Sequence, residues 1–81
     1  MIIEVSDSSL SYDRDEKAGL FAAAGIDDYW VINIPDRCVE IFRQPESGRY
    51  LSREVFKAPS DIHPLAFPQV TLPVMILFPS E

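Results

Sequence analysis

The sequence predicts an α+β domain in which a mixed sheet of about four strands packs against one main helix. Short runs rich in β-branched and aromatic residues alternate with turn residues, which is typical of strands. One segment near the start instead carries apolar residues at helical spacing. The chain has 81 residues and is 47% hydrophobic, which is enough for one small core and too apolar for a disordered chain. We therefore expect a single domain over residues 1–81.

A short strand is predicted at the beginning of the chain. Ile2 to Val5 is apolar apart from one charge, Glu4. Residues 6–11 are rich in serine and aspartate, which can satisfy the unpaired N–H groups at a helix start. Asp7 and the serines around it are therefore interpreted as the loop that leads into the helix.

The predicted helix begins between Ser9 and Asp13 and ends at Ala24, with Gly25 as the C′ residue. Side chains three or four residues apart lie on one helix face, and one such stripe should pack on the sheet. The stripe consists of Leu10, Asp13, Lys17, Leu20, Phe21 and Ala24. It contains two charged residues, and a charge at a packed face is costly unless it is paired or used.

Three β-rich segments follow, and their alternating patterns predict an antiparallel meander. They are Tyr29–Ile34, Val39–Arg43 and Tyr50–Phe56, separated by turns at 35–37 and 45–48. The remaining tail is rich in proline and carries scattered apolar residues, so we expect it to close an edge of the sheet. Within it, residues 74–78 should form either a helical turn or a short strand.

Composition excludes several classes of function. The net charge is −6, from 13 acidic and 7 basic side chains, which argues against binding nucleic acid mainly through a basic surface. An acidic metal site that meets phosphate through a divalent cation remains compatible with this charge. No apolar run is long enough to span a membrane and no signal-peptide pattern begins the chain, so we expect no membrane association.

Few residues resemble known catalytic or metal-binding patterns. The single Cys38 cannot form an intramolecular disulfide, fits a reducing cytoplasm and is interpreted as a half-buried strand residue. His63 has no partner at metal or triad spacing and is interpreted as a loop histidine. Tyr29 and Trp30 are expected in the core. Neither a glycine-rich phosphate loop nor a nucleophile elbow is present in the sequence.

Three features between Ile3 and Ile34 resemble a known family. They are the carboxylate Glu4 on an apolar strand, the helical segment Asp13-Arg14-x-x-Lys17, and the junction Gly25-Ile26-x-x-Tyr29-Trp30-Val31. Together they resemble the Uma-type endonucleases of the PD-(D/E)XK nuclease superfamily. The resemblance runs from Ile2 to about Phe78 and covers only the C-terminal half of the family's domain. It implies a restriction-endonuclease-like half-domain.

The resemblance implies roles for two residues. Glu4 matches the acidic member of the (D/E)XK element and would bind Mg²⁺, a hard cation that prefers oxygen ligands. The superfamily's usual lysine position holds Ser6, and Lys17 occupies the place of a lysine relocated to the next helix. There Lys17 would stabilise developing negative charge. The implied activity is Mg²⁺-dependent hydrolysis of phosphodiester bonds in DNA.

The family's second carboxylate is an aspartate on a preceding strand, and it has no counterpart before Met1. The sequence therefore predicts a truncated or split relative of a DNA endonuclease that is inactive alone. A second copy, or a partner supplying the N-terminal half, would have to provide the missing ligand. We accordingly expect a homo-oligomer or a complex with such a partner.

Other interpretations of the same residues remain open. Glu4 could be a solvent-facing strand residue, and Lys17 could extend from the helix edge or pair with Asp13. Arg14 could meet a phosphate or simply lie on the surface. The chain as a whole could be a non-catalytic module that self-associates through the exposed apolar strand Ile2–Val5. It could also be a gene remnant whose coding sequence continues upstream.

Overall fold

The structure is a computed structural model that describes residues 1–7 and 11–78, without the side chains of residues 11–14. It has an α+β fold, as predicted. The main elements are β1 (Ile2–Ser6), α1 (Ser11–Ala23), β2 (Asp28–Asn33), β3 (Cys38–Glu46) and β4 (Arg49–Phe56). The tail contains β5 (Asp61–Ile62), β6 (Leu72–Pro73) and the 3₁₀-helix η1 (Val74–Leu77). η1 is a helical turn, which was one of the two alternatives predicted for residues 74–78.

The four main strands form one mixed sheet in the order β1-β2-β3-β4. β1 pairs with β2 in parallel, and α1 provides the crossover that parallel neighbours require. β2, β3 and β4 form the predicted antiparallel meander. β1 and β4 are the two edges of this sheet, so the strand that carries Glu4 has a neighbour on one side only among the described strands.

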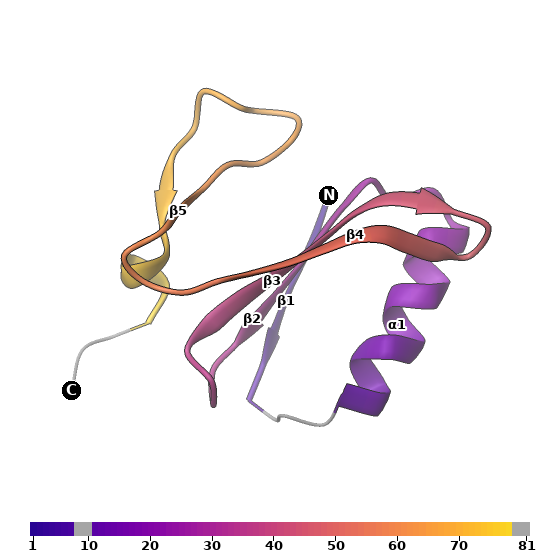
Figure 1. Cartoon of the computed structure of the whole chain (residues 1–81), viewed down its shortest axis with the longest axis horizontal. Coiled ribbons are helices and arrows are strands. Elements are labelled where there is room, and N and C mark those ends of the chain that lie inside the picture. Colours follow the sequence, from indigo (N-terminus) through magenta and orange to yellow (C-terminus); the bar gives the residue numbers. More distant parts are fainter. Residues whose placement is uncertain (8–10, 79–81) are drawn as a thin grey trace.

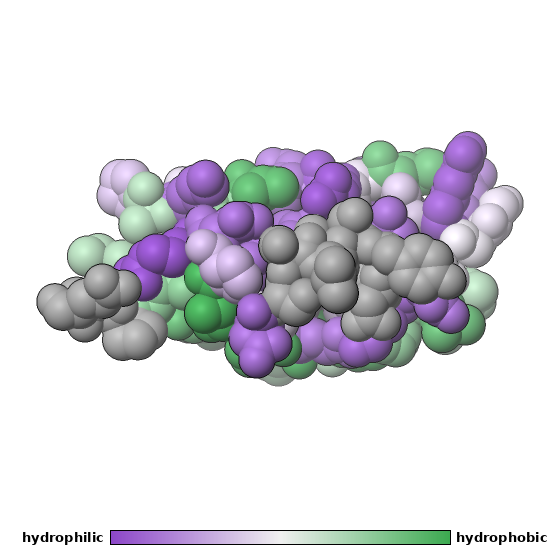
Figure 2. Space-filling model, turned by 90° about the horizontal axis from the view of Figure 1, so that it is seen from below, coloured by the Kyte–Doolittle hydropathy of each residue, from purple (hydrophilic) through white to green (hydrophobic). Residues whose placement is uncertain are grey.

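Helix α1 and the tail cover opposite faces of the sheet (Figure 1). The molecule is flat, with extents of 40 × 31 × 15 Å, and Figure 2 shows it along one long edge. Its shortest dimension matches four strands side by side at about 4.8 Å spacing. The two edge strands therefore lie close to the two broad surfaces of the molecule.

Two apolar clusters hold these layers together. Since alternate residues of a strand point to opposite faces, Tyr29 and Trp30 bury their side chains in different clusters. The cluster under α1 contains Ala18, Tyr29, Val31 and Phe42. The cluster under the tail contains Trp30, Val39, Ile41, Ile62, Val74 and Phe78. Both aromatic residues are core residues, as the sequence predicted.

The expectation that the tail closes an edge of the sheet was wrong. Ile62, Val74 and Phe78 pack on the face formed by β2 and β3 instead. A face offers apolar side chains such as Trp30 and Val39 for burial, whereas an edge offers mainly backbone hydrogen bonds. Among the described strands, β5 and β6 pair with each other and not with the main sheet.

α1 ends at Ala23, one residue before the predicted end, and Gly25 is the C′ residue as predicted. Gly25 has φ of 76°, and its N–H donates to the carbonyl of Ala22 at 3.0 Å. The N–H of Ile26 donates to the carbonyl of Phe21 at 3.0 Å. These two bonds form a Schellman motif, which favours glycine because of its positive φ.

The predicted packing stripe of α1 was wrong in part. Leu20 is 64% exposed, and Ala24 is exposed as well. Ala18 and Ala22 are buried against the sheet instead, with Phe21 partly buried beside them. Small side chains allow the helix backbone to lie close to β3 and β4, and this close approach selects the alanines. Leu10 and the side chain of Asp13 lie outside the described part.

Two smaller expectations also changed. The turn between β3 and β4 consists of Ser47 and Gly48 alone, with φ of 53° and 76°, so Pro45 and Glu46 belong to β3. Positive φ at both positions suits the right-handed twist of a two-residue hairpin. Cys38 is buried rather than half-buried; it begins β3, one of the two inner strands, opposite Asn33 at the end of β2.

Tyr50 links β4 to the segment that follows α1. Its hydroxyl donates to the carbonyl oxygen of Ile26 at 2.6 Å. Burial raises the pKa of Tyr50 above its usual value of 10.0, and the negative charges of Asp27 and Asp28 raise it further. The neutral phenol is thus favoured in the folded state relative to the unfolded one.

We expect this linkage to appear as alkaline destabilisation. The stabilising contribution of Tyr50 is fully present below pH 10, the ordinary pKa, and is lost as pH rises through the higher folded-state pKa. Urea unfolding of the protein and of Tyr50→Phe between neutral pH and pH above 10 measures it. The variant should lose less stability over this range. Equal losses in the two proteins would contradict the assignment.

Candidate functional site

Glu4 and Lys17, the two residues singled out by the sequence, meet in the structure. The Lys17 ammonium lies 3.3 Å from Oε2 of Glu4 and donates a hydrogen bond to it. The two residues are 13 positions apart and come from β1 and α1. The side chain of Glu4 is 30% exposed and that of Lys17 43% exposed, so solvent reaches the pair. An ion pair this exposed contributes little to stability, about 0–1 kcal/mol.

The fold explains why the pair forms. Glu4 lies opposite Val31 in the parallel ladder, on the same face of the sheet as α1. Exposed Ile3 and Val5 flank it on the other face, as strand alternation requires. α1 packs mainly over β3 and β4, so the α1-side face near β1 stays accessible. From that position Lys17 reaches across to Glu4.

Tyr29 is a third member of the site. Its ring is buried in the cluster under α1, and its hydroxyl donates to Oε2 of Glu4 at 3.4 Å. Both contacts made by described residues therefore reach the same carboxylate oxygen. No hydrogen bond from a described residue reaches the other oxygen, Oε1. The sequence identified Tyr29 only as a core residue, because a hydroxyl at the end of a buried ring leaves no pattern along the chain.

A second carboxylate on this face does not complete a metal site. Glu40 lies in the same cross-strand row as Glu4, with Val31 between them. Two strand spacings separate their backbones by about 10 Å. Glu40 is buried and accepts hydrogen bonds from Arg53 at 2.5 Å and from Asn33 at 3.3 Å. It is therefore engaged in structural contacts away from Glu4.

The donor set of Glu4 does not by itself fit Mg²⁺. Mg²⁺ is held in proteins by carboxylate, substrate and water oxygens in octahedral geometry. Among residues 1–7 and 15–78, no three histidine, cysteine, aspartate or glutamate side chains are grouped to hold a metal. This part of the chain also contains no pocket. Within the described residues, the remaining ligands of such an ion would have to be water, a substrate oxygen or a group from another chain.

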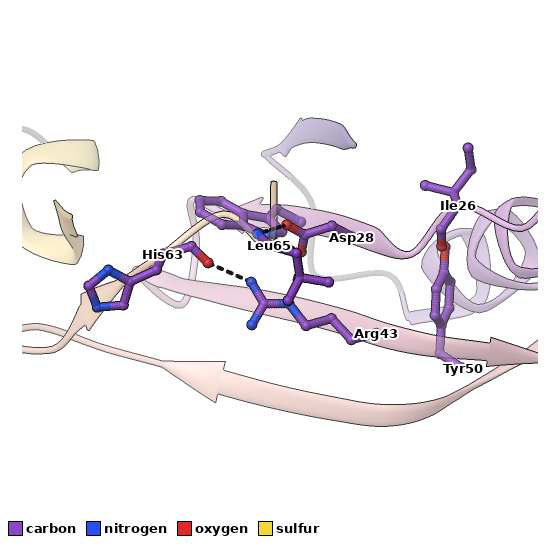
Figure 3. A network of polar contacts seen from close by, with 7 residues as sticks. Ile26, Asp28, Arg43, Tyr50, His63 and Leu65 are labelled. Carbon is purple, nitrogen blue, oxygen red and sulfur yellow. Dashed lines mark hydrogen bonds and ion pairs between the residues drawn. The ribbon is translucent and has the colours of Figure 1, made fainter. Parts of the chain in front are cut away.

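The other prominent polar network is structural (Figure 3). Asp28 is buried and accepts hydrogen bonds from Trp30 Nε1 at 2.6 Å, Arg43 Nε at 3.0 Å and the Leu65 N–H at 2.9 Å. Arg43 also donates to the carbonyl of His63 at 2.6 Å. The network joins β2, β3 and the loop after β5, and thereby fixes the tail to the sheet.

His63 is a loop residue, as predicted. Its Nδ1 lies 3.0 Å from the carbonyl oxygen of Val70, across the loop between β5 and β6. The buried role of Asp28 was not predicted. One signal was present in the sequence. Asp28 and Trp30 are two positions apart on a strand, so their side chains point to the same face.

A comparison with protein families identifies the family of this chain. The family model of Uma2, described as "Putative restriction endonuclease", matches residues 1–75. The chain belongs to the Uma2 family. The match includes β1 with Glu4 and α1 with Lys17, so the paired side chains lie within the Uma2 region. The family description makes a restriction-endonuclease-like nuclease the functional class to which the chain is related.

Two further comparisons gave no relative. No curated protein and no solved structure matches the chain. Within the described residues, the structure contains no helix that is both long and apolar enough to cross a membrane.

Proposed function

We propose that this Uma2 chain contributes one carboxylate and one lysine to a Mg²⁺-dependent nuclease site that hydrolyses phosphodiester bonds in DNA. The contact between Lys17 Nζ and Glu4 Oε2 at 3.3 Å carries this proposal, because it joins the two residues implied by the family resemblance. Glu4 would ligate the cation through Oε1, and Lys17 would stabilise negative charge on a phosphate oxygen. Tyr29 would orient the carboxylate.

Assembly is part of the proposal. Glu4 supplies one carboxylate, and no three histidine, cysteine, aspartate or glutamate side chains are grouped among the described residues, so a second acidic ligand would come from outside them. The outer edge of β1 is the place where an added strand would bring a carboxylate beside Glu4. We expect no DNA cleavage from the monomeric chain alone. Cleavage should require the added strand and its carboxylate.

Metal binding is the first test. Titration calorimetry with Mn²⁺ or Mg²⁺, with molecular mass determined in the same buffer, should show binding that weakens at least about tenfold in Glu4→Gln. Glu54→Gln is the matched control, since Glu54 lies exposed on β4, at the opposite edge of the sheet. It should bind like the parent protein. Metal binding that survives Glu4→Gln would contradict the role of Glu4.

Nicking of supercoiled DNA tests the catalytic part of the proposal. Any Mg²⁺-dependent nicking by the assembled protein should fall by about 10²-fold or more in Glu4→Gln and in Lys17→Met. Lys57→Met is the control for the lysine, because Lys57 is exposed just after β4. Nicking by a pure monomer, or nicking independent of Glu4, would show that another site is responsible.

A second candidate function is a non-catalytic module that binds a partner through β1. The exposed apolar residues Ile3 and Val5 favour it, since an exposed strand edge with apolar side chains tends to recruit another strand. Association without any Glu4-dependent metal binding would support this candidate over the nuclease.

A further inference from the structure

We propose that Phe21 is a positioning residue for Lys17 and sets where the ammonium group meets the carboxylate of Glu4. The contact between Lys17 and Glu4 is present in the structure, whereas the catalytic meaning of Phe21 rests on the proposed function of that pair. Phe21 lies outside the charged site and controls its geometry through the placement of α1.

Four side chains form a closed ring of contacts. Lys17 Nζ and the Tyr29 hydroxyl both donate to Oε2 of Glu4, at 3.3 and 3.4 Å. The ring of Phe21 meets the ring of Tyr29 edge-on, with 4.9 Å between centroids and an interplanar angle of 71°. Phe21 and Lys17 are four positions apart on α1, so they lie one turn apart on the same helix face. The seat of Phe21 on the sheet therefore determines where the Lys17 backbone lies relative to Glu4.

Tyr29 is the fixed part of this ring of contacts. Its side chain is fully buried on β2, an inner strand of the sheet. It stacks on Phe42 with 5.2 Å between centroids and lies 6.2 Å from the ring of Tyr50, so β3 and β4 both hold it. A buried ring packed against several others cannot shift without opening a cavity. The Tyr29 hydroxyl thus marks a constant point beside the carboxylate of Glu4.

Phe21 is the large anchor of α1. Among the described side chains of the helix, it is the one large apolar group packed on the sheet. The other contacts come from Ala18, Ala22 and Gly19, where an added Cβ would lie 3.7 Å from the carbonyl oxygen of Gly48 in the β3–β4 turn. Figure 1 shows this turn beside α1. Small residues have little shape to oppose sliding, whereas an edge-on aromatic contact has a preferred geometry.

The charged contact is too weak to place the helix by itself. The side chains of Glu4 and Lys17 are 30% and 43% exposed, and an ion pair that solvent reaches contributes little to stability. A lysine side chain also loses rotamer freedom when it is held in one geometry. The ion pair therefore follows from the apolar contact of α1. A misplacement of about 1 Å can cost about 10²-fold in rate when the displaced group takes part in the chemistry.

NMR of the Glu4 carboxyl carbon tests the positioning without metal or DNA. Lys17→Met removes the ammonium group and should change the chemical shift of this carbon in the parent protein. In a Phe21→Leu background the same substitution should change it by less than half as much, because the helix no longer holds the ammonium beside the carboxylate. A merely structural role of Phe21 would lower stability and leave this response unchanged.

Three further variants complete this measurement. Leu20→Ala is the matched control, since Leu20 is 64% exposed on the same helix, and it should respond like the parent protein. Phe21→Tyr keeps the ring and should also respond like the parent. Phe21→Met is a milder variant that keeps apolar volume and loses the aromatic edge, so its response should fall. An unchanged response in both Phe21→Leu and Phe21→Met, or an equal reduction in Leu20→Ala, would overturn the proposal.

A double-mutant cycle in the nicking assay tests the link to activity. In the assembled protein, Phe21→Leu should lower Glu4-dependent nicking about tenfold or more. In a Lys17→Met background it should lower the rate by no more than about twofold, since residues that act as a unit are not additive. Equal fold losses in the two backgrounds would overturn action through Lys17. If no assembly cleaves DNA, the proposed function is wrong, and the carboxyl response alone decides the positioning role.

Discussion

Replacing Asp28 by alanine should lower the free energy of unfolding by about 3–5 kcal/mol. Its carboxylate is buried and accepts three hydrogen bonds, including one from the guanidinium of Arg43. Without Asp28, three donors lose their acceptor where little water can replace it. They are the N–H groups of Trp30 and Leu65 and the guanidinium of Arg43. Urea unfolding followed by Trp30 fluorescence measures the loss.

The neighbouring Asp27→Ala variant is the control for this prediction, since Asp27 is exposed. It should change the free energy of unfolding by no more than about 0.5 kcal/mol. We also expect Asp28→Ala to raise amide hydrogen exchange in the loop from His63 to Val70, because two hydrogen bonds of the network end there. Equal stability of the two variants would mean that Asp28 does not hold the tail.

Tyr29→Ala should be the most damaging truncation in the cluster under α1, at about 3–5 kcal/mol. The ring is fully buried and makes an edge contact with Phe21 at 4.9 Å and a stacked contact with Phe42 at 5.2 Å between centroids. Deleting it leaves a cavity between the helix and the sheet, which rigid strands cannot close. Thermal and urea unfolding both report the effect.

Tyr29→Phe separates packing from the hydroxyl. It keeps the ring and removes the 3.4 Å hydrogen bond to Glu4, so it should cost no more than about 1 kcal/mol of stability. Metal binding that depends on Glu4 should nevertheless weaken, because the carboxylate loses one of its two hydrogen bonds from described residues. A large loss of stability in Tyr29→Phe would show that the hydroxyl is structural rather than a part of the site.

Much of the fold could be predicted because local chemistry determines it. The helix ends where Gly25 provides positive φ, and the β-rich runs become the strands of the meander. The packing face of α1 could not be predicted from spacing alone. Leu20 and Ala18 differ by only two positions, and the distance between helix and sheet decides which of them is buried.

For the candidate site, too, one part could be predicted from the sequence and another part could not. From the sequence, Glu4 and Lys17 were singled out by the resemblance to the Uma-type family, because the residue pattern alone left a solvent-facing Glu4 and a surface Lys17 open. Only the tertiary structure decided that these side chains meet, that Tyr29 joins them and that Glu40 stays apart. Such contacts depend on strand order and on the placement of the helix, and these are set by packing between segments distant in the chain.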